Sequence, residues 1–462
     1  MYRAPVVSFR SKLLRLEAAL PPPAAPCPGL ARDPDVAPDT SPDPSPDPDR
    51  APDARSATLD SLRQRIAAVL TREGRPPRPR PPVDCPDLPF LTEQTPLGPL
   101  HVRSLRLSAA HRTGRAPVLA ARDASASLLA LLALDPALAA CPARGALYLD
   151  TETTGLSGGT GTIAFLVGIA FWDEAGAHGG GDLVVEQLLV RNLGEEAPML
   201  ARLTGRIADA TMLVTFNGKA FDMPLLRTRY AMAKMALPRE PPHLDLVHVA
   251  RRLHKARGIA HKLTTIEREV LGFERVDDVP GSEVSARYLH FLRTGDAAAL
   301  LGVVEHNAWD VVAMAALVGL YGEPLEATTL AAEDLVGVAR TLARAGQRDE
   351  AFDMASRAID AGAGAAGLRA RADIAKARGD RARAMADFEA LATQVDDPAV
   401  RLELAKLYEH HVREPARALA LTLQGTGEHP EQASKRKRRL TKKVERSADG
   451  QGSLFRRRKP AT

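Results

Sequence analysis

The pattern of apolar and polar residues predicts a folded domain between residues 97 and 320. The alternation in LGPLHVRSLRL predicts a strand, and the apolar runs GALYLD, IAFLVGIAFW, DLVVEQLLV and TMLVTFN predict buried strands. Helical spacing predicts helices over residues 125–139, 195–208, 219–235 and 298–320, and HLDLVHVARRLH reads as a strand that runs into a helix. Three strands followed by alternating helices and strands predict an α/β fold with a mixed sheet flanked by helices.

After Gly322 the pattern changes to continuous helix, which predicts an all-helical second domain. Three segments resemble one another: AGQRDEAFDMASRAI, ARGDRARAMADFEAL and HVREPARALALTL. Their aligned alanines Ala351, Ala384 and Ala418 lie 33 and 34 residues apart, which is the tetratricopeptide period. The tetratricopeptide Trp and Tyr positions are mostly unfilled. Degenerate repeats and an alanine-rich bundle without repeat ancestry both fit this pattern.

Composition divides the remainder of the chain. Residues 21–53 contain twelve prolines and predict a disordered linker, which precedes a short helix at 57–72 and a Pro/Arg-rich stretch to residue 82. We therefore expect four parts. They are a largely disordered region with short helices at 1–91, an α/β domain at 92–322, tetratricopeptide-like repeats at 323–428, and a disordered basic tail at 429–462.

Charge is segregated along the chain, although the net charge is only +5. Residues 33–53 hold seven Asp and one Arg, whereas residues 431–459 hold twelve Lys/Arg against three Asp/Glu. The basic tail agrees with a polyanionic partner. Three scattered cysteines argue against a disulfide framework and favour a cytoplasmic location. Because no apolar run approaches about 18 residues, with the nearest at 128–140, we expect no membrane span.

Acidic residues gather where strands end. Asp150 and Glu152 stand two apart at the end of an apolar strand, so both carboxylates point to one face of the sheet. Asp222 follows another strand, near the start of a helix, and His306 and Asp310 share a helix face. Four carboxylates so placed predict a site for two Mg²⁺ or Mn²⁺ ions, which can catalyse phosphoryl displacement. His306 is the candidate base that deprotonates the attacking water.

These residues resemble three exonuclease motifs of the DEDD (DnaQ-like) superfamily. DTETTGLSGGTGTIAFLVGIAF, FNGKAFDMPLL and EHNAWDVVAMAAL are similar to the YprB-type ribonuclease H-like domain family over about residues 95–322. The resemblance implies a ribonuclease H-like fold and metal-dependent 3′→5′ hydrolysis of nucleic acid from an end. It implies Asp150, Glu152, Asp222 and Asp310 as metal ligands. In the third motif this chain departs from the superfamily pattern, because it has His306 four residues before Asp310 and Glu305 five before it.

Several residues near the motifs are candidates for substrate contact. The resemblance implies that Thr153, Thr154, Gly155 and Leu156 touch the terminal nucleotide. Lys219 is a candidate for contact with a phosphate. Asn217 is a candidate for substrate contact, and it also fits the role of a turn or cap residue that supports the Asp222 helix. Asp245 is interpreted as a buried structural carboxylate.

Two functions follow from the sequence. The first is a metal-dependent nuclease, specifically a 3′→5′ exonuclease that acts on DNA or RNA. The alternative is a non-catalytic adaptor that binds nucleic acid through its basic tail and a protein partner through its helical repeats. With 4% aromatic residues, an extensive base-stacking surface is not expected, so binding should depend on the phosphate backbone and on salt.

Overall fold

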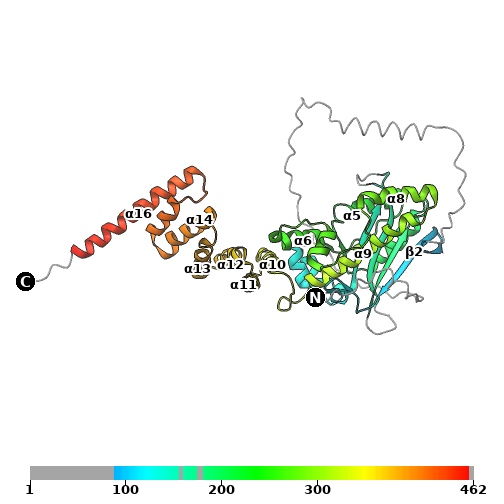
Figure 1. Ribbon diagram of the computed structural model, residues 1–462, viewed down its shortest axis with the longest axis horizontal. Coiled ribbons are helices and arrows are strands. Elements are labelled where there is room, and N and C mark those ends of the chain that lie inside the picture. The colour runs from blue at the N-terminus through cyan, green and yellow to red at the C-terminus, as the bar shows by residue number, and fades with distance from the viewer. Residues whose placement is uncertain (1–87, 156–159, 174–180, 457–462) are drawn as a thin grey trace, which may run out of the picture. The chain divides into compact units, whose positions relative to one another are not determined.

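The computed structural model describes residues 88–155, 160–173 and 181–456, with side chains described as far as residue 447. Residues 91–321 form a seven-stranded mixed sheet with helices, and the chain continues as helices only (Figure 1). The strands of the sheet are β1 (Leu91–Thr95), β2 (Gly98–Leu107), β5 (Ala146–Thr153), β6 (Ala164–Asp173), β7 (Asp182–Leu189), β8 (Met212–Thr215) and β9 (His243–Asp245). A separate two-stranded ribbon pairs β3 (Arg112–Thr113) with β4 (Ala116–Pro117).

The strand order is β1-β2-β7-β6-β5-β8-β9. Neighbours from β1 to β5 are antiparallel, whereas β8 and β9 run parallel to β5. The short connections of β5, β6 and β7 produce the antiparallel part, and the helical crossovers before β8 and β9 produce the parallel part. The predicted mixed sheet is therefore confirmed.

Both faces of the sheet are covered, so the strands are apolar on both sides. The helices α4 (Glu196–Asp209) and α5 (Asp222–Met232) pack on one face, where β5 presents Leu147 and Leu149. On the other face, β5 presents Tyr148 to a core built from α9 (Ala298–Tyr321), α6 (Leu246–Leu253) and α3 (Ala126–Ala133). The alternation along β5 consequently decides which helices each acidic residue meets.

Helix α9 is the central helix of this second face. Of the part of the chain that the structure describes, it is the one helix long and apolar enough to cross a membrane, and 78% of its most apolar window is buried. The helix packs against β5, β6 and β7, so that burial is accounted for by the core. We expected no apolar run of about 18 residues. This expectation missed α9, because charged residues interrupt the apolar sequence of this helix.

Two local predictions differ from the structure. The helix expected over residues 125–139 ends at Ala133, because Leu134 adopts a left-handed conformation (φ 57°) and Pro136 follows. A 3-10 turn, Pro136–Ala140, completes the segment, with Asp135 accepting a hydrogen bond from the Ala137 N–H. The structure also contains α8 (Gly281–Thr294), which the apolar pattern did not predict. The short helix α7 (Leu263–Ile266) and a π turn at Glu267–Leu271 precede it.

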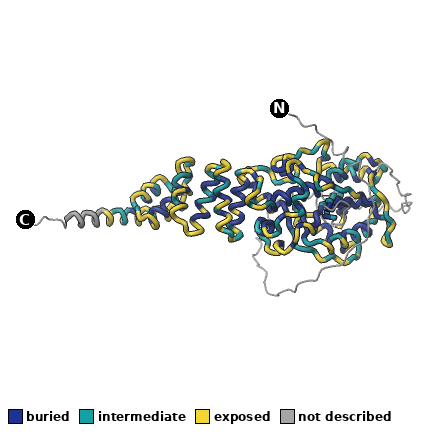
Figure 2. The backbone as a smooth tube through the Cα atoms, turned by 90° about the horizontal axis from the view of Figure 1, so that it is seen from below, coloured by how far each residue is buried: buried dark blue, intermediate teal, exposed yellow. Residues whose placement is uncertain are grey.

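The all-helical region confirms the second part of the predicted fold class. Its helices are α10 (Ala332–Arg344), α11 (Arg348–Asp360), α12 (Gly364–Arg378), α13 (Arg381–Ala392), α14 (Pro398–Leu407) and α15 (Pro415–Leu423), in which buried and exposed residues alternate (Figure 2). The aligned alanines Ala351, Ala384 and Ala418 lie on α11, α13 and α15, and each is fully buried. Each therefore occupies a position where neighbouring helices approach closely. Tetratricopeptide ancestry stays a prediction.

The basic tail is not disordered where it is described. Residues Pro430–Arg456 form the helix α16, and its Leu440 is completely buried in the core of the helical region. Glu409, also buried, accepts hydrogen bonds from Arg439 and Lys443 of this helix. The prediction of disorder was wrong because the charge count gave no sign of this apolar anchor or of its buried acidic partner.

Several expectations fall outside the described residues. These are the linker at 21–53, the helix at 57–72 and Leu156, together with two of the three cysteines, Cys27 and Cys85. Cys141 is described, and it is a buried free thiol.

Candidate active site

The end of β5 delivers two acids to one place. Asp150 and Glu152 lie on the face of β5 that meets α9, and the strand is irregular between Glu152 and Thr153. Helix α9 brings His306 and Asp310, one turn apart, to the same place. The His306 Nε2 lies 3.5 Å from Asp310 Oδ2 and 4.0 Å from Glu152 Oε1. One ligand atom from each of these three residues lies within 4.8 Å of the others, so this cluster could bind a metal ion.

Asp222 approaches from the opposite layer. It is the first residue of α5, where the positive end of the helix dipole favours a carboxylate. The Thr151 hydroxyl, on the other side of β5, donates a 2.5 Å hydrogen bond to Asp222 Oδ1. Asp150 is electrostatically coupled to Asp310, Glu152 and Asp222. The structure therefore brings together all four acids that the sequence singled out, from β5, α5 and α9.

Burial and crowding disturb the protonation of these acids. Burial, followed by the charges of Asp310, Glu152 and Asp222, raises the pKa of Asp150 well above its ordinary value. Burial also raises the pKa of Glu152 to about 8, although the nearby His306 opposes the change. The pKa of Asp222 rises to about 6 through burial, against the hydrogen bond from Thr151. Dications would remove this mutual repulsion, and carboxylate oxygens are ligands that suit Mg²⁺ and Mn²⁺.

His306 lies between the acids and a further carboxylate. Its Nδ1 is 2.6 Å from Asp278 Oδ1, which leaves Nε2 toward Glu152 and Asp310. Burial lowers the pKa of His306, but the bond to Asp278 and the charges of Asp310 and Glu152 outweigh it and raise the pKa to about 9. The charge of Glu305 acts on Arg103, where it opposes the lowering of the Arg103 pKa by burial. The structure thus brings His306 to the cluster, beside Glu152 and Asp310.

Arg275 is a residue of this site that the sequence did not indicate. Its guanidinium donates hydrogen bonds to Glu267 (2.6 Å) and to Asp310, and it lies 3.5 Å from Asp278. Its side chain is 4% exposed, and it stands over the Trp309 ring. Arg275 supplies one fixed positive charge beside Asp310. It lies in an irregular segment outside the three motifs, so no periodicity or spacing points to it.

A row of polar residues crosses the sheet beneath α9. In the strand registers, Asp150 of β5 is paired with Gly168 of β6, Gly168 with Gln187 of β7, and Gln187 with Arg103 of β2. Asn307 of α9 inserts its amide above Gly168. Its Nδ2 donates to Asp150 Oδ2 (2.9 Å), and its Oδ1 accepts from Gln187 Nε2 (2.9 Å). Arg103 donates to Gln187 Oε1 (3.0 Å), so hydrogen bonds link residues of β2, β7 and α9 to Asp150 of β5.

Gly168 makes this row possible. A Cβ added at Gly168 would lie 2.2 Å from Asn307 Oδ1, far inside any real contact. Asn307 and Gln187 are completely buried, so their amides depend on one another for hydrogen bonds. Gly168 interrupts an otherwise apolar strand. A glycine inside a strand can indicate that another part of the chain packs closely against it, and this was the signal that the sequence offered for the approach of α9.

The predicted substrate residues lie around the end of β5 and the start of α5. Thr153 and Thr154 use their hydroxyls within the local turn, bonding to the Gly155 carbonyl and the Ile163 N–H respectively. Lys219 is exposed, and Asn217 has a left-handed backbone (φ 71°). These positions are compatible with the expected substrate contacts, which stay predictions.

Asp245 holds the loop that precedes α5. It is 4% exposed and accepts hydrogen bonds from the backbone N–H groups of Asn217 (2.7 Å) and Lys219 (3.0 Å). Its interpretation as a buried structural carboxylate agrees with these contacts. Phe221, one residue before Asp222, is 60% exposed, which is unusual for a large apolar side chain.

The sheet order and the site define the class of domain, and comparison with known proteins agrees. Residues 147–321, less than half of the chain, match the RNase H superfamily. This stretch includes all four acids and His306. The chain is also 39% identical over 172 residues to the uncharacterized protein YprB of Bacillus subtilis (strain 168). The match covers 37% of this chain and 40% of that relative, so the likeness concerns a part of each protein.

Replacing Gly168 with Ala should displace Asn307 and destabilise the protein by about 1–3 kcal/mol, since overpacking and a broken buried hydrogen bond add together. Gly205→Ala is the matched control. Gly205 is exposed in the interior of α4 with nothing near its missing Cβ, so the change should stabilise by about 0.5–1 kcal/mol. Chemical unfolding measures both. If Asn307 causes the clash, Gly168→Ala should cost much less in an Asn307→Ala background.

The metal-free protein should lose stability between about pH 6.5 and 8, by on the order of 1–2 kcal/mol. Glu152, with a pKa near 8 against an ordinary 4.5, and His306, near 9 against 6.5, hold their protons more tightly in the folded state. The stability that these two groups contribute is therefore lost as the pH rises. Burial lowers the pKa of His101 and of His243 to about 4. These two groups make stability rise with pH, but only below about pH 6.5.

This loss can be measured by unfolding in EDTA across the same pH range. Glu152→Gln should flatten the fall, because the titrating group is removed. Saturating Mn²⁺ should reverse it, since ligands that lose protons bind the ion more tightly at higher pH. A stability that is flat in EDTA and unaffected by Mn²⁺ would contradict the assignment of these acids to an ion site.

Proposed function

We propose that this chain is a Mg²⁺- or Mn²⁺-dependent nuclease, and specifically a 3′→5′ exonuclease that shortens DNA or RNA. The observation that carries the proposal is the cluster of Asp150, Glu152, Asp222 and Asp310 on three different elements, with His306 beside it. The RNase H superfamily domain supports a nuclease-type hydrolase. The 3′→5′ direction rests on the resemblance of the three motifs to the DEDD exonucleases.

The four acids would hold two dications, and the hydrogen bond from Asn307 to Asp150 Oδ2 orients the Asp150 carboxylate. Bound there, the ions would supply a clamp on the attacking and leaving oxygens of an in-line displacement. Asp278 orients the His306 ring, so that Nε2 faces the cluster and can take the proton of the attacking water. The hydrogen bond to Asp278 is the largest cause that raises the pKa of His306, and the charges of Asp310 and Glu152 add to it. Bound cations would remove the contribution of these two acids, which shifts the pKa toward neutral pH.

Other residues would position the substrate. Lys219 is exposed near the start of α5 and is suited to a phosphate contact. Phe221 offers an exposed ring next to Asp222, where a terminal base could stack. Thr153 ends β5, and Thr154 and Gly155 follow it, as expected for contacts with the last nucleotide. Leu156, the fourth residue expected to make this contact, lies outside the described residues. A single stacking ring agrees with binding that depends mainly on the phosphate backbone.

The alternative function is an adaptor that binds nucleic acid without cleaving it. The exposed cations of α16 and the helical region favour this reading, because neither is needed for the chemistry. Titration with Mn²⁺ in a calorimeter separates the two proposals. A pure adaptor should lack a tight divalent-cation site at Asp150 and its neighbours.

Asp150→Asn and Asp222→Asn should each lower the rate of hydrolysis by more than about a hundredfold, since even the loss of a group that only hydrogen-bonds a metal ligand costs about 10–100-fold. Single-stranded DNA and RNA labelled at the 5′ end, incubated with Mn²⁺, should give a ladder of shortened products with the unchanged protein. Asp209→Asn, at the exposed end of α4, is the control and should keep full activity. Undiminished cleavage by the Asp150 and Asp222 variants would disprove the proposed site.

His306→Ala should lower the single-turnover rate by about 10²–10⁴ and remove one limb of the pH–rate profile, as expected for loss of a general base. His290→Ala, on the surface of α8, is the matched control. The affinity for Mn²⁺, measured in parallel, distinguishes two roles. A large fall in affinity would identify His306 as a ligand, and an unchanged pH profile would remove it from the mechanism.

A further inference from the structure

Helix α16 has one face on which its charges are already compensated. Leu440 is buried on this face, and the cations beside it bond to two acids of the helical region. Arg439 and Lys443 donate to Glu409 at 2.7 and 2.8 Å. Arg436 donates to Glu428 at 2.9 Å and lies 3.4 Å from Glu409. These cations hold the helix in place and are not free to bind a partner.

The opposite face carries a basic stripe, which we define as Lys435, Arg438, Lys442 and Arg446. All four residues are exposed, and none forms an ion pair or hydrogen bond with another residue that the structure describes. Their spacing of 3, 4 and 4 residues places them within about 80° around the helix, on the side opposite Leu440. At 1.5 Å per residue, the basic stripe is about 16 Å long.

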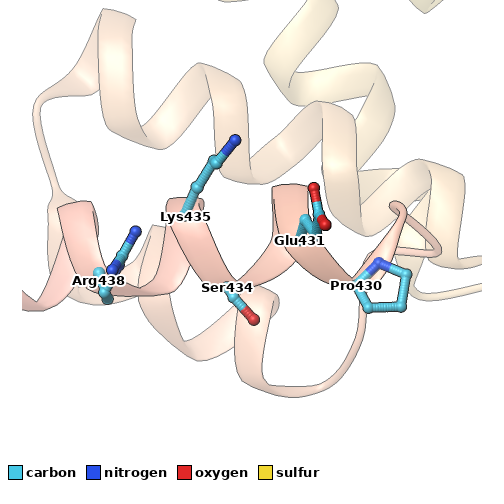
Figure 3. A pocket seen from close by; sticks show the side chains of 5 residues that line it. All are labelled: Pro430, Glu431, Ser434, Lys435 and Arg438. Atoms are coloured by element: carbon cyan, nitrogen blue, oxygen red, sulfur yellow. The ribbon is translucent and has the colours of Figure 1, made fainter.

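The start of the basic stripe borders a shallow hollow in the surface. Pro430, Glu431, Ser434, Lys435 and Arg438 line it, from successive turns of α16 (Figure 3). Glu431 and Glu445 are the two acids among the described side chains of α16. Glu431 lies in line with the basic stripe, one turn before its first residue, and Glu445 lies beside it. From Lys435 to Arg446 the four positions of the stripe itself are all cations.

We propose that the basic stripe binds the phosphate backbone of a nucleic acid, at a site separate from the nuclease chemistry. Each strand of a duplex presents one phosphate per about 3.4 Å of axis, so a row of about 16 Å faces four or five phosphates of a strand. Both the row and the backbone are linear and regularly charged. A membrane surface fits less well, because an interfacial helix needs an apolar face, and Leu440 of α16 is buried in the protein.

The test measures binding in EDTA, so that it does not depend on hydrolysis. A fluorescein-labelled 30-nucleotide single-stranded DNA is titrated with the full chain at several salt concentrations. Arg438→Gln combined with Lys442→Gln should weaken binding about tenfold at 0.15 M salt and reduce the slope of log K against log salt by about 1.4, because two phosphate contacts are lost. Arg438→Lys with Lys442→Arg keeps the charges and should bind like the unchanged protein.

The matched control is Arg348→Gln combined with Arg381→Gln, which removes two exposed cations from α11 and α13. Circular dichroism checks that every variant keeps its helices. An unchanged affinity and slope in the Arg438/Lys442 variant would show that the basic stripe is only solvated. Equal losses of affinity in both double variants would show that binding depends on the net charge of the chain and not on the basic stripe. Preferential binding of phosphatidylserine vesicles over the DNA would assign the surface to membranes. Each of these results would overturn the proposal, whatever the outcome of the hydrolysis assays.

Discussion

The concentration of negative charge at the end of β5 is the constraint on which this structure depends. Four carboxylates meet there with little access to water, and burial together with mutual repulsion raises the pKa values of three of them. Arg275 and His306 offset this charge beside Asp310, and Asn307 donates a hydrogen bond to Asp150. These groups do not neutralise four acids. Divalent cations would compensate the carboxylate charge that remains. The crowding of acids that is unfavourable for folding is therefore useful for ion binding.

Helix α9 carries three residues of the site. Within one turn it presents His306, Asn307 and Asp310, and the rest of the helix is locked into the core against β5, β6 and β7. The row from Arg103 through Gln187 to Asn307 fixes the rotation of the helix, because buried amides permit few arrangements in which every group is bonded. Gly168 supplies the space for this row. The position of Asp150 is therefore tied to residues in β2 and β7 that lie far from the acids in sequence.

The sequence predicted what depends on local periodicity and missed what depends on irregular or long-range contacts. Period-2 alternation correctly placed Asp150 and Glu152 on one face, and the 33- and 34-residue spacing correctly marked three alanines that are buried. Arg275 and the Asn307 row could not be found in this way, because their partners come together only through the tertiary fold. The helix expected at 125–139 was too long, since Leu134 takes a left-handed conformation before Pro136. The tail was wrongly predicted to be disordered, because a charge count does not register Leu440 or the buried Glu409.

The two charged surfaces of the chain have complementary consequences. Carboxyl groups do not attract phosphate, so the acidic cluster does not by itself supply affinity for a nucleic acid in the absence of ions. The basic stripe of α16 has the opposite property, because its cations are exposed and uncompensated while their neighbours are paired with Glu409 and Glu428. Binding through the stripe would depend on salt and not on divalent ions, whereas hydrolysis would depend on both. Placing affinity and chemistry on separate elements would let the nuclease site keep the strongly negative character that ion binding requires.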